Sequence, residues 1–370
     1  MESRRSDVDA MRCIGALLVA VFHIWIGGIS GGVDVFFVLT GYFLTKKLTN
    51  KYEDNGKVTV FEVYKDFFYR VAPESLLTLL FILLIGLALF HPLNWSGFLN
   101  EYFASIFYVE NYALIAKEAD YLQRDESLSL VQHFWATSLI GQIYIIWPII
   151  FFISISMSKR TNQKAWRLNY NILLIVVFSV SFAWSVFKTS SSPVSAYFDL
   201  TTRIWQFCAG GLVVSFQNLP TSKAIKSFGQ LSWLGILMIL TCGVIIGTRE
   251  NFPGYASLWP VLGACLILIF GDQNRKGNAS YWISAPALVK LSKLSFGIYL
   301  WHWPLVVAIY IFALSEVYLY LGILLSIILG FLSYHFIERI KFQNDFTHVL
   351  SYLKCKPIYC SGLLLSLIHI

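Results

Sequence analysis

The chain has 370 residues, of which 57% are hydrophobic and 13% are charged. Because an average soluble protein has about 25% charged residues, this composition excludes an ordinary soluble domain and predicts an integral membrane protein. The net charge of +7 does not indicate nucleic-acid binding, since Lys and Arg concentrate in short connections between apolar runs, as expected for the cytoplasmic loops of a membrane protein.

Ten apolar runs follow one another along the chain, many of them close to the roughly 20 residues that a helix needs to cross a bilayer. The runs lack the alternation of membrane β-strands, so we predict an all-α, polytopic helix bundle of about ten transmembrane helices. If the spans alternate, the basic connections share one side with the N-terminus, which is therefore predicted to be cytoplasmic. The predicted spans are residues 12–29, 33–48, 74–91, 137–156, 169–187, 203–216, 231–247, 256–271, 294–313 and 317–336.

Residues 1–342 are predicted to form one transmembrane domain. The longest exterior connection, residues 92–136, is rich in aromatic residues and is expected to fold over the bundle as an interfacial cap. The chain then continues as a C-terminal tail, residues 343–370. The last apolar run, residues 361–370, is too short to cross a bilayer alone and would fit a truncated further span.

The first predicted span carries three polar residues on one helical face. Arg12 and His23 are separated by about three full turns and about 16 Å along the axis, and Asp9 lies one turn before Arg12. These side chains are costly in lipid, so we expect them to face a polar interior. His23 could act as a general base or an acyl-accepting group, and Arg12 could hold a phosphate or a carboxylate. The alternative is a histidine satisfied within the bundle, with Arg12 extended to the membrane surface.

Further candidates lie within or just before the next two spans. Asp34, at the start of the second span, would lie near His23 and either orient the imidazole or cap the helix N-terminus. The pair Thr40-Gly41 would let another helix or a ligand approach the backbone. Arg70, before the third span, either binds an anionic donor or anchors the span on the positive side.

Four more candidates lie near the exterior ends or inside later spans. His133 and Trp135 precede the fourth span, and the indole also fits an interfacial aromatic belt. Arg203 stands at an exterior boundary, against the positive-inside bias, and so needs a salt bridge or a substrate as its partner. His302 lies in the ninth span between aromatic residues that could stack on a sugar ring or pack in the core.

These segments, in this order, resemble the membrane acyltransferase family 3, which includes O-antigen acetylases and Nod-factor acetyltransferases. Asp9-Ala10-Met11-Arg12 is similar to the D-G-L-R opening of the family, and the stretch from Arg12 to His23 is similar to its R-x10-H element. Each motif is weak alone, but the ordered series over about residues 7–342 is specific. The later matching motifs are Phe36-Phe37-Val38-Leu39-Thr40-Gly41, Phe252-Pro253-Gly254, Tyr299-Leu300-Trp301-His302-Trp303-Pro304 and Ser333-Tyr334 to Ile337-Glu338.

The resemblance implies a multi-pass O-acyltransferase of the bacterial inner (cytoplasmic) membrane. Such an enzyme moves an acyl group, usually acetyl, from cytoplasmic acyl-CoA to a hydroxyl of an extracytoplasmic or lipid-linked glycan such as O-antigen or exopolysaccharide. Acetyl-CoA is then a donor substrate, and no bound cofactor and no metal site are expected. The resemblance implies that His23 is the catalytic residue and that Arg12 supports the donor. Together with the residue patterns above, it leads us to predict three groups of site residues. The catalytic residues are His23, Arg12 and Asp34; the donor-binding residues are Asp9, Thr40, Gly41 and Arg70; the acceptor-binding residues are His133, Trp135, Arg203 and His302.

The chain departs from the family pattern at three places. Ile140 and Gly141 stand where the family often has two glutamates, and Phe67 stands at the first position of its R-x-x-R element. Gln206 replaces the glutamate of its R-x-W-E element. Loss of these carboxylates would alter acceptor binding or weaken the enzyme.

Two other functions stay open at this point. A transporter of a glycan precursor or small metabolite would line its path with the polar face of the first span, although the repeat symmetry common in transporters is not visible here. A catalytically degenerate family member would explain the missing glutamates. The six cysteines have no metal-binding spacing, and four of them lie within apolar runs.

Overall fold

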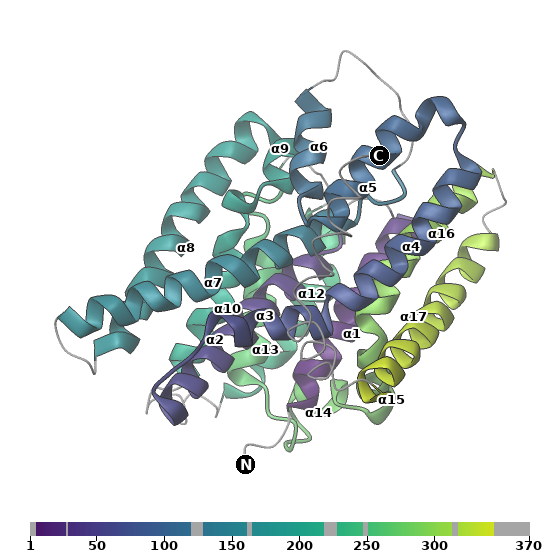
Figure 1. Ribbon diagram of the computed structural model, residues 1–370. Coiled ribbons are helices and arrows are strands. Elements are labelled where there is room, and N and C mark those ends of the chain that lie inside the picture. Colours follow the sequence, from purple (N-terminus) through teal and green to yellow (C-terminus); the bar gives the residue numbers. More distant parts are fainter. Residues whose placement is uncertain are drawn as a thin grey trace.

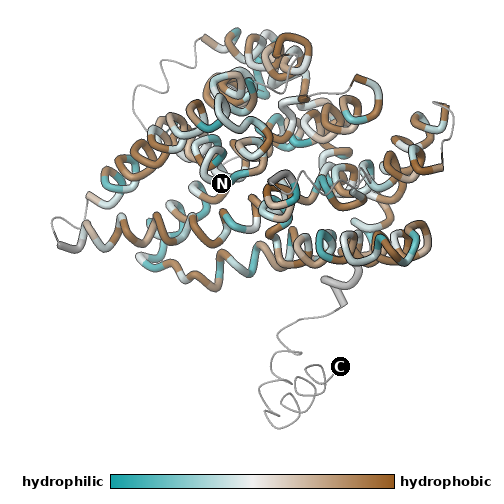
Figure 2. The backbone as a smooth tube through the Cα atoms, turned by 90° about the horizontal axis from the view of Figure 1, so that it is seen from above, coloured by the Kyte–Doolittle hydropathy of each residue, from teal (hydrophilic) through white to brown (hydrophobic). Residues whose placement is uncertain are grey.

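The computed structural model describes residues 5–26, 29–119, 129–160, 165–217, 228–246, 251–312 and 317–343. Within these ranges the chain forms helices and connections with no strand, which confirms the all-α prediction (Figure 1). Hydrophobic residues extend along much of the length of the helices (Figure 2). Apart from its first residue, the predicted tail of residues 343–370 lies outside the described residues.

Each of the ten predicted spans falls on a helix of the described chain. The helices are α1 (Ser6–Val21) continued by η1 (Phe22–Ile26), α2 (Gly32–Asn55), α4 (Ala72–Leu89), α7 (Phe134–Arg160), α8 (Trp166–Ser191), α10 (Ile204–Gln217), α12 (Leu231–Ile246), α13 (Leu258–Phe270), α16 (Ser295–Ile311) and α17 (Val317–Gln343).

Six helical segments among the described residues are long and apolar enough to cross a membrane, so the chain is a multi-pass membrane protein. They correspond to α1 with η1, α4, α7, α8, α16 and α17, whereas α10, α12 and α13 are shorter apolar helices. The 24-residue α2 is apolar in its first half and charged in its second half, so a part of it extends beyond an apolar layer. The number of crossings and the side of the N-terminus stay predictions.

Shorter helices lie at the two ends of the bundle. The predicted cap over residues 92–136 contains helices, and α6 packs on α9 at the end of the molecule opposite to α14 and α15 (Figure 1). The start of α1 contacts α14 and α15 at that other end. These shorter elements are α3 (Val60–Arg70), η2 (Pro92–Asn94), α5 (Trp95–Ile106), α6 (Glu110–Ala119), α9 (Pro193–Phe198), η4 (Leu200–Thr202), α14 (Ala279–Ile283), α15 (Pro286–Leu291) and η7 (Ser292–Leu294).

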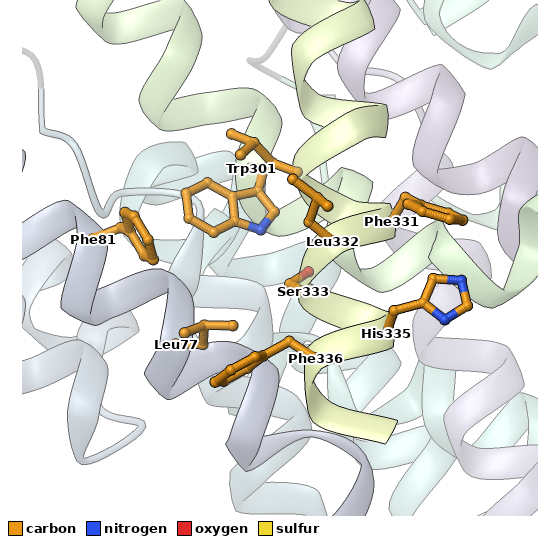
Figure 3. Close-up of a pocket in the computed structure, with 9 residues that line it drawn as sticks. Leu77, Phe81, Trp301, Phe331, Leu332, Ser333, His335 and Phe336 are labelled. Atoms are coloured by element: carbon orange, nitrogen blue, oxygen red, sulfur yellow. The ribbon is translucent and has the colours of Figure 1, made fainter. Parts of the chain in front are cut away.

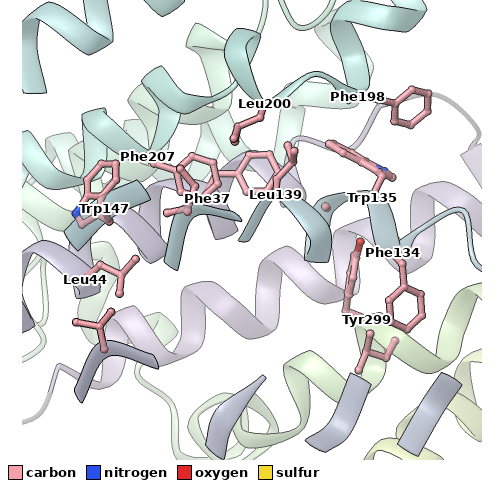
Figure 4. Packing of buried hydrophobic residues seen from close by; sticks show 14 of the residues in the cluster. Phe37, Leu44, Phe134, Trp135, Leu139, Trp147, Phe198, Leu200, Phe207 and Tyr299 are labelled. Atoms are coloured by element: carbon pink, nitrogen blue, oxygen red, sulfur yellow. The ribbon is translucent and has the colours of Figure 1, made fainter. Parts of the chain in front are cut away.

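The largest interhelical contact joins α2 and α10 through two glycines. A methyl group on Gly41 would lie 1.9 Å from the carbonyl oxygen of Phe207, and one on Gly210 would lie 1.9 Å from that of Val38. The absence of both side chains lets the backbones touch, and the ring of Phe37 stacks on Phe207 at 4.7 Å beside this crossing (Figure 4). Small residues serve this purpose in membrane bundles, where close backbone packing stabilises helix association.

Candidate active site

His23 lies in η1, the π-helical turn that continues α1. Its Nδ1 lies 3.0 Å from Nε2 of His302 in α16. The two rings stack with centroids 5.2 Å apart, and the indole of Trp303 meets the His23 ring edge-on at 5.0 Å. Single π turns occur frequently at functional sites because they change the direction of the side chains that follow. The fold thus brings together two histidines that the sequence suggested for different roles.

His302 is held by its own helix. Its Nδ1 lies 2.6 Å from the carbonyl oxygen of Tyr299 and 3.2 Å from that of Ile298, one turn earlier in α16. The side chain is fully buried. The imidazole can therefore not turn toward a substrate without breaking these bonds, and only its Nε2 faces His23.

A third histidine is fixed where α16 contains a proline. Pro304 has no N–H, so the carbonyl group of Leu300 lacks the partner that an ordinary helix would supply four residues later. Nε2 of His133 donates to this carbonyl oxygen at 2.9 Å, and the hydroxyl of Tyr299 donates to the carbonyl oxygen of His133. The start of α7 is thereby bound to the middle of α16, and the ring of His133 lies 5.9 Å from that of His302.

Asp34 lies in a buried polar cluster with residues at the start of α10. Its Oδ1 lies 3.2 Å from Nη1 of Arg203 and accepts a hydrogen bond of 2.8 Å from the amide of Gln206. The side chains of Asp34 and Arg203 are 2% and 1% exposed. A buried charge is tolerated when it is paired and hydrogen-bonded, so the local reason for Arg203 is a salt bridge.

The position of Asp34 corrects both interpretations of this residue. The helix N-cap is Gly31, and the described bonds of Asp34 go to Arg203 and Gln206, whereas the described ring contacts of His23 are with residues of α16. Asp34 does not orient the imidazole in this structure. The paired carboxylate instead ties α2 to α10.

Aromatic rings enclose the guanidinium group of Arg203. Its central carbon lies 4.8 Å from the ring centroid of Tyr197, 5.0 Å from that of Phe252 and 5.5 Å from that of Trp135. Cation–π contacts of this kind stabilise a desolvated guanidinium group. Trp135, expected to lie in the interfacial belt, is 6% exposed and packs on Arg203 inside the cap end of the bundle.

Two of the residues predicted to bind the donor, Asp9 and Arg70, lie with Arg12 away from the His23 end of α1. Asp9 and Arg12 form an ion pair at 3.9 Å across one helical turn, and the guanidinium group of Arg12 lies 4.4 Å from the ring centroid of Phe43 in α2. The hydroxyl group of Tyr144 in α7 is within electrostatic reach of the carboxylate of Asp66 and of both Arg70 and Arg12. Arg12 of α1 and Arg70 of α3 thus lie in one group of charged residues that also includes Asp9 and Asp66, which we call the positive cluster after its two arginines. The side chain of Arg12 is 37% exposed.

Thr40 and Gly41 have structural partners. The hydroxyl of Thr40 donates to the carbonyl oxygen of Phe36 at 2.8 Å, within its own helix. Of the two expected neighbours of Gly41, another helix or a ligand, the structure shows the helix: α10 packs directly against this glycine. Neither contact involves the positive cluster.

The four residues predicted to bind the acceptor are all buried. Their exposed fractions are 3% for His133, 6% for Trp135, 1% for Arg203 and 0% for His302. Their described contacts are with protein groups: His133 and His302 bind backbone carbonyl groups of α16, and Arg203 binds Asp34 of α2 and packs on Trp135.

Exposed aromatic rings beside His23 were not singled out by the sequence. The ring of Trp25, 41% exposed, lies 4.9 Å from that of Tyr320, which is 63% exposed. Trp25 follows His23 by two residues, and this closeness in the sequence could have identified the indole as a candidate. This pair offers a surface on which a sugar face or a lipid could stack.

An apolar cavity of about 700 Å³ lies beside α16, on the side of Trp301 (Figure 3). Its polar wall includes the hydroxyl of Ser333, which donates to Oε1 of the buried Glu74 at 3.1 Å. Residues of α4, α16 and α17 line it: Leu77, Phe81, Trp301, Leu329, Phe331, Leu332, Ser333, His335 and Phe336.

Comparison with known proteins gives matches over almost the whole chain. A family described as acyltransferase domain matches residues 5–335. The O-acetyltransferase OatA of Staphylococcus aureus strains NCTC 8325 / PS 47 and COL is 24% identical over 345 residues, which cover 90% of this chain and 56% of OatA. The protein SACOL0978 of strain COL is 26% identical over 348 residues, with the same shares of 90% and 56%. The chain therefore spans about half the length of these relatives. No solved structure gives a significant match.

Proposed function

This chain belongs to the family of acyltransferase domains, and from that premise we propose that it is a membrane-bound O-acetyltransferase. The observation that carries the proposal is the His23–His302 pair, which places an imidazole near the end of α1 that lies away from the positive cluster. Acetyl-CoA is the proposed donor, on the cytoplasmic side. The proposed acceptor is a hydroxyl group of an extracytoplasmic or lipid-linked glycan, such as O-antigen or exopolysaccharide.

The reaction needs one group that accepts a proton and later returns it. Imidazole is suited to this work near neutral pH. In the proposed step, His23 takes the proton of the acceptor hydroxyl as its oxygen attacks the carbonyl carbon of the thioester. The new C–O bond forms, the C–S bond breaks, and the CoA thiolate takes the proton from the imidazolium ring. His23 is then neutral again, and the products are the acetyl ester and free CoA.

The positive cluster would hold the donor. Guanidinium groups bind phosphates through paired hydrogen bonds, and CoA carries several phosphates. Arg12 is partly exposed and Arg70 lies nearby at the end of α3. By the helical rise, Arg12 and His23 are about 16 Å apart along α1, so a flexible donor arm would have to reach along this helix to present the acetyl group.

The proposal is tested with purified protein in lipid nanodiscs, given acetyl-CoA labelled in the acetyl group. Wild-type protein should release CoA and pass the label to added glycan. His23→Ala should lower this rate by about 10²–10⁴, the usual contribution of a general base. His91→Ala is the matched control, because His91 is an exposed histidine beside η2. A wild-type rate in the His23 variant would refute the catalytic assignment.

The acceptor is identified by mass spectrometry of surface glycans from cells with and without the gene. Loss of an acetyl-sized mass from one sugar names the glycan and the hydroxyl. If the same cells lose the glycan from their surface while no labelled acetyl leaves CoA in nanodiscs, the transport alternative replaces acyl transfer.

A further inference from the structure

We propose that His302 is a positioning residue that holds His23 in the tautomer whose Nε2 accepts the proton. The catalytic meaning of this inference rests on the proposed function, whereas the tautomer itself does not. The inference replaces acceptor contact as the role of His302.

The first step is the proton on His302. Its Nδ1 lies 2.6 Å and 3.2 Å from two carbonyl oxygens, those of Tyr299 and Ile298. Carbonyl oxygens only accept hydrogen bonds, so Nδ1 of His302 must carry a hydrogen. This assignment follows from the partners and needs no assumption about His23.

The second step is the charge of the pair. The ring of His302 is fully buried in the middle of α16, and the described contacts of this residue include no carboxylate. An unpaired cation at such a place in a membrane protein is strongly disfavoured. His302 is therefore neutral, and its Nε2 carries a lone pair.

The third step assigns the proton of His23. Because Nε2 of His302 accepts, the bond of 3.0 Å requires Nδ1 of His23 to donate. A neutral imidazole has one N–H, so Nε2 of His23 is its basic nitrogen. The near-parallel stack of the two rings, at 22°, and the edge contact with Trp303 limit rotation of this ring.

This arrangement does the work that a buried aspartate performs in the Ser-His-Asp triad, where it fixes the tautomer of the catalytic histidine. The carboxylate that could have served here, Asp34, is bound to Arg203 and Gln206. A neutral imidazole has the advantage that it adds no charge to the interior of the bundle.

The test uses two variants that differ in reach. His302→Gln keeps an acceptor oxygen near the place of Nε2, whereas His302→Asn is one methylene shorter and cannot reach His23. Histidine rings are labelled with ¹⁵N in the full chain in nanodiscs, and the His23 signals are assigned by their loss in His23→Ala. Wild-type protein and His302→Gln should show a proton on Nδ1 of His23, and His302→Asn should show the proton on Nε2.

Kinetics provide the second readout. His302→Asn should lower kcat about 100-fold with an unchanged KM for acetyl-CoA, and His302→Gln should recover most of this loss. His91→Asn, at an exposed histidine, should change neither tautomer nor kcat. A proton on Nε2 of His23 in wild-type protein overturns the inference even if a variant does not fold. So does an unchanged kcat in folded His302→Asn.

The two proposals fail in different ways. If His23 has its proton on Nδ1 and loses it in His302→Asn, but wild-type protein transfers no acetyl group, the positioning role stands and the proposed function falls. If acetyl transfer depends on His23 while the tautomer is the opposite one, the proposed function stands and the positioning role falls.

Discussion

At the scale of single residues, burial separates the charges that hold the bundle together from those that can meet a substrate. Arg203 and Asp34 are almost fully buried and are paired with each other through Nη1 and Oδ1, so both charges serve the interior of the bundle. Arg12 is 37% exposed, although it also has an ion-pair partner in Asp9. Of the two arginines, only Arg12 has the access that a water-soluble donor needs.

The buried group of Asp34, Arg203 and Gln206 explains why a glutamine stands where the family pattern has a glutamate. The amide of Gln206 donates to Oδ1 of Asp34, whereas a glutamate there would place a second carboxylate beside it with one arginine for both. Gln206→Glu should therefore lower the stability of the fold by about 1–3 kcal/mol, because two buried carboxylates would then lie side by side with a single guanidinium group to balance them. Thermal unfolding in detergent measures this loss. Adding Asp34→Asn to the variant should restore much of it, and an additive loss in the double variant would contradict the explanation.

Glu110, at the start of α6 outside the predicted spans, predicts a dependence of stability on pH. Burial, followed by the nearby charge of Glu101, raises the pKa of Glu110 from 4.5 to about 10. Between these values the folded state keeps a proton that the unfolded chain has lost, so stability is greatest below the unfolded pKa and falls as the pH rises toward 10. Glu110→Gln should remove this slope and stabilise the protein at pH 8 by about 1–3 kcal/mol.

The measurement is the unfolding temperature in detergent between pH 5 and pH 9, a range chosen about the two pKa values. Glu62 in α3 is the matched control, because its hydrogen bond from Lys51 lowers the pKa of this carboxyl group to about 2. Its contribution is present above the unfolded pKa and is lost only as the pH falls toward 2, so Glu62→Gln should leave the alkaline slope unchanged. Equal slopes in wild type and Glu110→Gln would show that Glu110 is not the cause.

At the scale of elements, two local irregularities build the site. A π turn ends α1 at His23, and Pro304 frees a carbonyl group of α16 that holds His133. The π turn and the proline each interrupt an otherwise regular apolar helix. The histidines of the site lie at these two interruptions or bind to them. Regular packing, in contrast, is set by glycine contacts such as that of α2 with α10.

The glycine contact between α2 and α10 gives a third prediction. Gly41→Ala would put a methyl group 1.9 Å from a backbone carbonyl oxygen, which cannot move without separating the helices. The substitution should cost about 1–3 kcal/mol of stability, as overpacking does elsewhere. Gly97→Ala in α5 is the control, because no atom lies within 4 Å of the added group, and it should be neutral or slightly stabilising. Unfolding temperatures compare the two, and equal values would show that the crossing can relax.

At the scale of the whole molecule, the sequence predicted what depends on local composition. All ten apolar runs fall on helices because hydrophobic length is a property of each segment. The pairing of His23 with His302, 279 residues away, and of Asp34 with Arg203, 169 residues away, depends on which helices pack together. Hydropathy contains little of that information, so the sequence identified the polar residues of the site but placed Asp34 beside His23 instead of Arg203 and did not pair His23 with His302.

The proposed direction of transfer requires one orientation of the bundle in the membrane. The residues near the end of α2 include Lys46, Lys47, Lys51 and Lys57, so this end should lie in the cytoplasm, together with the positive cluster that is proposed to hold the donor. Cysteine labelling tests this in a variant whose native cysteines are replaced by serine. An impermeant maleimide should label His91→Cys, exposed beside the cap, in intact cells, and Asp54→Cys, exposed at the end of α2, only after the membrane is opened. The reverse pattern would put Arg12 and Arg70 on the side where cytoplasmic acyl-CoA cannot reach them, and the donor assignment would then fail even if the histidine pair proved correct.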